Sequence, residues 1–287
     1  MNYRHIFHAG HICDVAKHIV LTMLLAHLRG KEAGFFALDS HAGAGLYDLH
    51  DLRALKTGEA KSGIYKLLRA PPLPDAPDYY RILELFNPGW KPAMGADGLG
   101  QFRFYPGSPL FIREMLRPQD KLIACEWHAD DVIDLKRQFR AMRNAHVHHR
   151  DGYEALGAFL PPAEARGLVL IDPPYEEPDE FARLSIVLPV AHGRWPQGMF
   201  MIWYPVKERP SVWRFHEALT QSGIPKILCA EFMFEEETRG DRLNGSGLIL
   251  VNPPWQFDER LRALFPQLHD ALQTPDRGAR VEWLTKE

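Results

Sequence analysis

Short apolar runs recur along the chain, and between them apolar side chains return at helical spacing. The runs that predict β-strands are residues 35–38, 121–126, 146–149, 167–171, 199–204, 227–234 and 247–251. Segments 130–142 and 212–221 repeat apolar residues at the period of a helix, which predicts amphipathic helices between the strands. Strands that alternate with helices build a largely parallel sheet covered on both faces.

The last two apolar runs depart from this alternation. They are joined by residues 235–246, a polar segment that is too short and too rich in charge and glycine for a crossover helix. Strands joined in this way pair antiparallel. We therefore expect an α/β fold of the Rossmann-like kind, with a seven-stranded, mostly parallel sheet and an antiparallel last strand.

A long segment separates the first two strands. Asp39 and Glu126, at the ends of these strands, are 87 positions apart, far more than one crossover helix needs. We expect a main domain of residues 1–46 and 105–287 and a small helical insertion at 47–104. The helices of the insertion should be 59–68 and 79–86, separated by a linker at 71–74. The insertion should flank the substrate entrance. Its basic side chains either grip nucleic acid or form a solvated face; they are Lys56, Lys61, Lys66 and Arg69.

The run 167–171 ends in the motif Asp172-Pro173-Pro174-Tyr175. Both prolines fix φ, so the carboxylate of Asp172 and the carbonyl of Pro173 can point together into a crevice. Two acceptors that face one NH2 group make its nitrogen a better nucleophile, and Tyr175 offers a face on which a planar base can stack. The motif therefore indicates methylation of an amino nitrogen on a planar ring, although the same residues also form ordinary turns.

A second pair of prolines occurs in Asn252-Pro253-Pro254-Trp255, after the run 247–251. In such sheets ligands bind at the carboxyl ends of the parallel strands, near the point where the strand order reverses. Asp172 ends a parallel strand, whereas Asn252 ends the antiparallel strand and should lie at the opposite edge. We therefore assign the chemistry to Asp172 and a structural turn to Asn252.

Three other strand ends should share the edge of the sheet with this motif. The first strand runs into Asp39-Ser40-His41-Ala42-Gly43-Ala44-Gly45, where small residues such as Gly43 let backbone amides approach a ligand closely. Glu126 either bridges two ribose hydroxyls or is a solvated turn residue. Asp151 either accepts from the amino group of a cofactor adenine or caps the helix that starts at Gly152. The order of these features indicates an S-adenosylmethionine-dependent class I methyltransferase.

The chain also resembles the bacterial ribosomal RNA large subunit methyltransferase J family, whose members methylate N6 of an adenine in 23S rRNA. The resemblance spans nearly the whole chain and rests on seven motifs: Tyr3-Arg4-His5-Ile6-Phe7-His8-Ala9-Gly10, Asp14-Val15-Ala16-Lys17-His18, the loop 39–45, Tyr105-Pro106-Gly107-Ser108-Pro109-Leu110, Ile171-Asp172-Pro173-Pro174-Tyr175, Trp203-Tyr204-Pro205-Val206 and Val251-Asn252-Pro253-Pro254-Trp255. The departures from the family pattern are Ser40, where threonine is common, and a long segment at 87–100 that is rich in glycine and proline.

The resemblance implies a role for individual residues. The expected cofactor contacts are His18, His41, Gly43, Ser108, Glu126, Asp151, Gly152 and Asp172. The expected catalytic residues are Asp172, Pro173 and Tyr175, and the expected contacts to the RNA are Tyr3 and Lys17. Besides Glu126 and Asp151, three of these residues also have a structural explanation. His18 could pack within the apolar helix that ends at Gly30, Ser108 could be the N-cap before Pro109, and Tyr3 could pack the chain terminus.

Composition bears on metals, partners and location. The 14 histidines include a group at the start of the chain, but the three cysteines, Cys13, Cys125 and Cys229, form no C-x-x-C pair, so we expect no bound metal. A net charge of −3 argues against broad coating of nucleic acid but allows a local basic stripe. Residues 136–150 form either such a stripe or only the polar side of a helix. The longest apolar stretch, 19–28, is too short for a bilayer, and we expect a cytoplasmic monomer with 23S rRNA as its partner and no obligate protein partner.

Three other functions fit parts of the sequence. A DNA adenine-N6 methyltransferase uses the same four-residue motif but normally adds a base-reading domain and a stronger basic footprint. A protein glutamine methyltransferase faces the same planar-nitrogen problem, with Asn instead of Asp in the motif. A cofactor-binding RNA chaperone would not need intact Asp172 and Tyr175.

Overall fold

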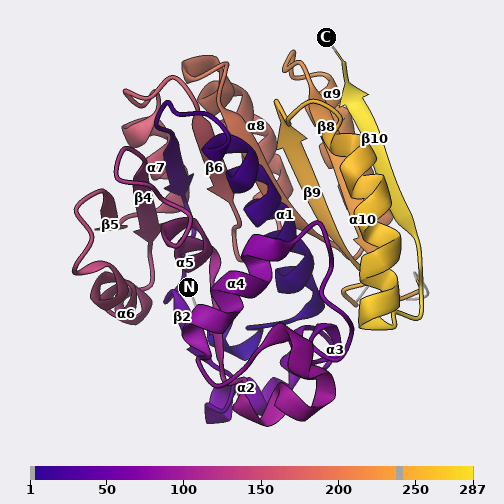
Figure 1. Ribbon diagram of the computed structural model, residues 1–287. Coiled ribbons are helices and arrows are strands. Elements are labelled where there is room, and N and C mark those ends of the chain that lie inside the picture. Colours follow the sequence, from indigo (N-terminus) through magenta and orange to yellow (C-terminus); the bar gives the residue numbers. More distant parts are fainter. Residues whose placement is uncertain (1–3, 237–241, 287) are drawn as a thin grey trace.

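The computed structural model describes residues 4–236 and 242–286, which form one large sheet between two layers of helices (Figure 1). From one edge to the other the strands are β10 (Ala279–Thr285), β8 (Ile227–Met233), β9 (Gly245–Val251), β7 (Met199–Val206), β6 (Gly167–Ile171), β1 (Phe36–Asp39), β4 (Lys121–Glu126) and β5 (Ala145–His149). β7, β6, β1, β4 and β5 are parallel, whereas β9 and β10 run antiparallel to their neighbours. The strand order reverses beside β1, because β6 and β4 flank it on opposite sides.

The strands are buried on both faces, and alternate side chains enter two separate cores. Ala37 and Leu170 join the core under α1, whereas Leu38 and Val169 join the core on the other face. The helices over the first core are α1 (Ile12–Arg29), α5 (Ser108–Arg113), α6 (Ala129–Phe139) and α10 (Phe257–Leu272). Those over the second core are α7 (Gly152–Phe159), α8 (Glu180–Arg194) and α9 (Arg209–Thr220). This arrangement confirms the class I methyltransferase type of α/β fold, with an antiparallel strand near the end of the chain.

The expected number of seven strands is wrong, because β10 adds an eighth at the edge of the sheet, where it pairs antiparallel with β8. Its side chains are half-buried or exposed, so it lacks the continuous apolar run that marks the central strands. The antiparallel pairing of the two preceding strands is confirmed, and β9 lies between β7 and β8.

The segment between the first two expected strands begins and ends in a small separate sheet. β2 (Leu46–Asp48) pairs antiparallel with β3 (Phe104–Pro106), and between them lie α2 (Leu52–Thr57), η2 (Glu59–Lys61), α3 (Ile64–Leu67), α4 (Pro77–Phe86) and η3 (Pro92–Gln101). Figure 1 shows these helices beside the lower end of α1. Tyr79 and Trp90 are fully buried in the same core as α1, and Tyr79 stacks on Phe111 of α5.

The single helix expected at 59–68 is divided by Gly63. A Cβ at Gly63 would lie 2.1 Å from the carbonyl oxygen of Gly10 and 2.6 Å from the amide nitrogen of Ile12, so only glycine allows this approach to the start of α1. The amide of Ile64 donates to the same Gly10 carbonyl at 2.8 Å. The break therefore ties the insertion to the N-terminal segment.

Asn252 lies at the edge of the sheet opposite to Asp172, as expected. Its side-chain amide donates to the carbonyls of Pro196 and Gly198 at 2.8 and 2.9 Å, beside the start of β7. Its φ of 52° is in the left-handed region, which asparagine tolerates better than most residues. Within the described ranges, no helix has the length and apolar character needed to span a bilayer.

Candidate active site

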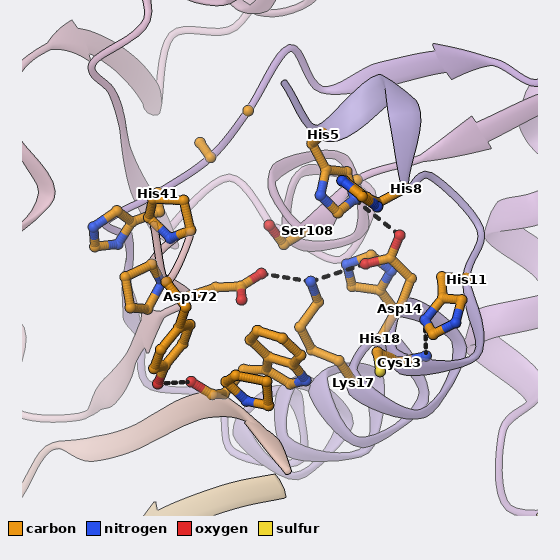
Figure 2. Close-up of a pocket in the computed structure, with 18 of the residues that line it drawn as sticks. His5, His8, His11, Cys13, Asp14, Lys17, His18, His41, Ser108 and Asp172 are labelled. Carbon is orange, nitrogen blue, oxygen red and sulfur yellow. Dashed lines mark hydrogen bonds and ion pairs between the residues drawn. The ribbon is translucent and has the colours of Figure 1, made fainter. Parts of the chain in front are cut away.

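A cavity of about 290 Å³ opens at the carboxyl ends of β1, β4 and β6, beside the N-terminal half of α1 (Figure 2). Nine of the residues expected from the sequence line it together: Lys17, His18, His41, Gly43, Ser108, Glu126, Asp172, Pro173 and Tyr175. Residues that are far apart in the sequence meet there because parallel strands present their ends along one edge.

Three expected residues are not among those that line this cavity. Tyr3 lies outside the described residues. Asp151 caps α7, accepting from the amides of Tyr153 and Glu154 at 2.9 and 3.0 Å. Gly152 packs under the loop after β1, where a Cβ would lie 2.5 Å from the ring of His41. The structural alternative for Asp151 is thus present, and Gly152 lies against His41, which itself lines the cavity.

The glycine-rich loop after β1 is held by a carboxylate from the neighbouring strand. The amides of Gly43 and His128 donate to Glu126 at 2.7 and 2.5 Å. Gly43 has a φ of 65°, and a Cβ there would lie 2.1 Å from the hydroxyl of Tyr47, which accepts from the Ala44 amide. Burial raises the pKa of Glu126, although these amides oppose the rise. The loop is therefore a tight backbone cradle with an acidic side chain beside it.

Asp172 extends into the cavity from the turn after β6. The ammonium of Lys17 donates to Oδ2 of Asp172 at 2.5 Å and to Oδ1 of Asp14 at 3.0 Å, as the dashed lines in Figure 2 show. Burial alone would lower the pKa of Lys17, but the two carboxylates outweigh it, and the pKa lies above its usual value. Asp172 therefore sits in an ion pair and lines the cavity at the same time.

Tyr175 closes the motif in a left-handed conformation, with a φ of 51°, which is unusual for a bulky side chain. Its hydroxyl donates to the carbonyl of Trp203 at 2.8 Å, and its ring meets the Trp203 ring edge-on at 5.6 Å between centroids. The turn is thus held by β7, and two aromatic rings border the cavity beside Asp172.

His18 is buried beside the cavity and stays neutral. Its Nδ1 forms a hydrogen bond with the Tyr105 hydroxyl at 2.9 Å, and its ring packs on Phe111. Burial and the nearby Lys17 charge keep the pKa of His18 well below its usual value. His18 therefore packs within the protein, as its structural explanation predicts, and also lines the cavity.

Ser108 and Asp39 form a buried polar pair at the end of β1. Ser108 is inside the first turn of α5, where Gly107 holds the N-cap position, so the N-cap role given as the structural alternative for Ser108 is wrong. Asp39 is fully buried, and neither carboxylate oxygen has a hydrogen bond of regular geometry. Burial raises the pKa of Asp39 to about 7, opposed by the Ser108 hydroxyl.

His41 projects from the loop after β1 and contacts Ser40 through a hydrogen bond of 2.8 Å at Nδ1. Its ring meets Tyr153 edge-on. Burial lowers the pKa of His41 to about 4, so the imidazole is neutral near pH 7. A neutral ring on this edge is suited to pack against a ligand and to exchange a hydrogen bond with it.

A family model described as ribosomal RNA large subunit methyltransferase D, RlmJ, matches residues 32–285. The chain belongs to this family. It is 38% identical, over the full length of both chains, to ribosomal RNA large subunit methyltransferase J of Haemophilus influenzae, and 36% identical over the same extent to the protein of that name from Escherichia coli K12. A crystal structure of protein LPL1258 from Legionella pneumophila superposes with a TM-score of 0.85 at 31% identity, covering 96% of this chain and 98% of that one.

Several residues that line the cavity of this RlmJ-family chain were not predicted from the sequence. The main ones are His5, Asp14, Tyr47 and Trp203. Three of these stand inside motifs quoted for the resemblance, but spacing alone does not tell which motif residues face a cavity. Tyr47 begins the insertion, and its position under the glycine loop depends on the pairing of β2 with β3.

The described part of the chain also gathers three possible metal ligands, His216, Cys229 and Glu231, between α9 and β8. The Tyr204 hydroxyl lies among them, forming hydrogen bonds with His216 and Glu231 at 2.9 Å each. Arg209 donates to the second oxygen of Glu231 at 2.5 Å. The polar side chains of this buried network therefore satisfy one another through hydrogen bonds.

Proposed function

We propose that the chain transfers the methyl group of S-adenosylmethionine to N6 of an adenine in 23S rRNA. One observation carries this proposal: the carboxylate of Asp172 lines the same cavity as the glycine loop and Glu126. Asp172, as an acceptor for an amino group, and the glycine loop with Glu126, as a site for a nucleoside, therefore face the same cavity. The names of the full-length relatives, which are ribosomal RNA large subunit methyltransferases, support RNA as the substrate class.

The residues present fit the cofactor. The loop at Gly43 offers a cradle that a Cβ would fill, and the carboxylate of Glu126 stands beside it for ribose hydroxyls. Asp39 is a buried carboxylate without a regular hydrogen bond at the adjacent strand end, where an amino group would find an acceptor. His18, His41, Ser108, Asp151 and Gly152 complete the proposed contacts. When bound, S-adenosylmethionine supplies an electrophilic methyl group on its sulfonium.

The side chains and backbone of the protein bind and orient the adenine. Asp172 and the carbonyl of Pro173 accept hydrogen bonds from the adenine amino group, which orients the nitrogen and stabilises the positive charge that develops on it. Asp172 or solvent then takes the proton that the methylated nitrogen loses, and S-adenosylhomocysteine is the leaving group. Tyr175, fixed by its hydrogen bond to Trp203, packs against the base. Lys17 holds Asp172 in place through the ion pair. The adenine has to be unpaired or extruded, since a stacked base cannot enter the cavity.

The inserted segment 47–104 stands at the entrance in this proposal. Glu59 of η2 lines the cavity and accepts from His8 at 3.0 Å, so the insertion contributes directly to its wall. We infer that the RNA approaches over this segment. Tyr3 and Lys17 are the proposed RNA contacts of the N-terminal part, and the chain acts as a monomer without a metal.

The test is to incubate the protein with radiolabelled S-adenosylmethionine and unmodified 23S rRNA, 16S rRNA, duplex DNA or a glutamine-containing peptide. We expect label in 23S rRNA alone, and N6-methyladenosine after nuclease digestion and mass spectrometry. Label in DNA or peptide, or another methylated nucleoside, would contradict the proposal. Treatment with a chelator should leave the rate unchanged.

A further inference from the structure

Asp14 is not among the residues expected to act in the site, yet three hydrogen-bond donors converge on its buried carboxylate. Oδ2 accepts from Nε2 of His5 at 2.9 Å and from the amide of Gly10 at 3.0 Å, and Oδ1 accepts from Lys17 at 3.0 Å. The side chain is almost completely inaccessible to solvent. Asp14 therefore joins η1 (His5–Phe7), the first turn of α1 and the ammonium that pairs with Asp172.

The charge balance of this cluster depends on Asp14. With Asp14 and Asp172 ionised and Lys17 protonated, the three groups carry one net negative charge. Without Asp14, the buried ammonium would be balanced by Asp172 alone. Two opposite charges in contact at low dielectric attract strongly, and the remaining pair would hold Asp172 against the lysine.

Asp172 has to accept from a substrate amino group in the proposed function, so an ammonium bound to it competes with that amino group. By sharing the ammonium, Asp14 weakens this competition. Asp14 also fixes the ammonium laterally, because Lys17 is three residues further along α1 and lies on the same helix face. A helical pair of this kind sets the direction from which Lys17 meets Asp172.

We propose that Asp14 is a positioning residue for methyl transfer, which divides the Lys17 ammonium between two carboxylates and so leaves Asp172 able to accept from the substrate amine. This inference rests on the proposed function. Asp14 acts through Lys17 and touches neither substrate nor cofactor in the proposed step.

The titratable groups around Lys17 are Asp14 and His18 of α1, His5 of η1, Asp39 of β1 and Asp172 after β6. The ring of Trp203 in β7 also lies 5.8 Å from the ammonium. Asp14 is one of the two carboxylates that hold the pKa of Lys17 above its usual value against the effect of burial. Its removal should therefore lower the pKa of Lys17, since burial then faces only one opposing carboxylate.

The experiment compares Asp14→Asn and Asp14→Glu with Asp120→Asn in the full chain. Asp120 is a matched control: it is also fully buried and accepts from a backbone amide, that of Phe35, and from a cation, Arg117, but at the opposite edge of the sheet. For Asp14→Asn we expect kcat to fall by about 10-fold or more while the Kd for S-adenosylmethionine changes by less than about threefold. Asp14→Glu should recover part of kcat.

A second measurement distinguishes positioning from a purely structural role. In cofactor-free protein, the ¹³Cε signal of Lys17 should show the ammonium form up to about pH 10 in the parent chain and titrate within that range in Asp14→Asn. The alkaline limb of the pH–kcat profile should move to lower pH in the same variant. Asp120→Asn should lower thermal stability and leave both profiles unchanged.

The proposal is overturned if Lys17 titrates alike in Asp14→Asn and the parent chain, or if kcat falls no further than in Asp120→Asn. The NMR titration does not need turnover. If the parent chain transfers no methyl group to RNA, the proposed function fails, while the lysine titration still reports whether Asp14 controls the ammonium.

Discussion

Asp172 has two partners to satisfy, the Lys17 ammonium in the protein and the amino group proposed for the substrate. We expect Asp172→Asn to lower kcat by about 100-fold to 10,000-fold, because the amide replaces one of the two acceptor oxygens with an NH2 donor. The Kd for S-adenosylmethionine should change by less than about 10-fold, since the glycine loop and Glu126 remain. Methyl incorporation and calorimetry measure the two effects.

Asn252→Ala is the matched control for that variant, because it alters the other proline motif at the opposite edge. The variant loses hydrogen bonds to two carbonyls and should cost about 1–2 kcal/mol of unfolding free energy with turnover retained. A folded Asn252→Ala protein without activity would show that the chemistry had been assigned to the wrong motif.

Asp39 makes folding stability depend on pH in a direction opposite to that of most carboxylates. Burial raises the pKa of Asp39 in the folded protein to about 7, whereas its pKa in the unfolded chain is near 3.8. Its contribution to folding stability is therefore fully present below pH 3.8 and is lost as the pH rises through 7. Asp39→Asn should therefore be more stable than the parent chain at pH 8, by on the order of 2–4 kcal/mol, and should match it near pH 4. Urea unfolding of both proteins at the two pH values tests this sign. An advantage at pH 4 that vanishes at pH 8 would refute it.

Among the elements, the junction between the insertion and α1 depends on Gly63. Gly63→Ala would place a methyl group against the backbone of Gly10 and Ile12, which cannot move without displacing the start of α1. We expect a loss of more than about 2 kcal/mol in unfolding free energy, together with reduced activity. Gly100→Ala, in η3, meets no atom within 4 Å and should be nearly neutral. Equal melting temperatures for the two variants would argue against a tight junction.

The sequence predicted the elements that build the edge of the sheet where the cavity lies, and the reasons are visible in the structure. β4 and β6 are continuous apolar runs ending in Glu126 and Asp172, and strand direction alone placed Asp172 and Asn252 at opposite edges. β10 was missed because an edge strand needs no apolar run. The contacts of Asp14 were missed because they depend on how η1 folds back onto α1, which no local pattern reveals.

On the scale of the whole molecule, two basic regions could meet RNA, because a net charge of −3 still allows local basic stripes. Lys56 and Lys61 are exposed on either side of Glu59, which lines the cavity, whereas Lys136 on α6 and Arg140 at its C-cap are exposed elsewhere. If the RNA approaches over the insertion, Lys56→Glu with Lys61→Glu should weaken RNA binding by about 10-fold and flatten its salt dependence. Fluorescence anisotropy at several salt concentrations measures both quantities. A larger loss from Lys136→Glu with Arg140→Glu would move the RNA path to α6.

Leu46 pairs directly with Pro106, so the chain leaves the main fold and returns to it at one point. Recombination between family members could therefore exchange most of the segment between these two positions without altering the pairing of β1 with β4. A chimaera that keeps Tyr79 and Trp90, which are buried in the core shared with α1, and Gly63, which lies against the start of α1, and takes its other residues at 49–103 from a relative, should fold and methylate with the parent's chemistry. Any change in the RNA that the chimaera prefers would then be caused by the exchanged residues at 49–103.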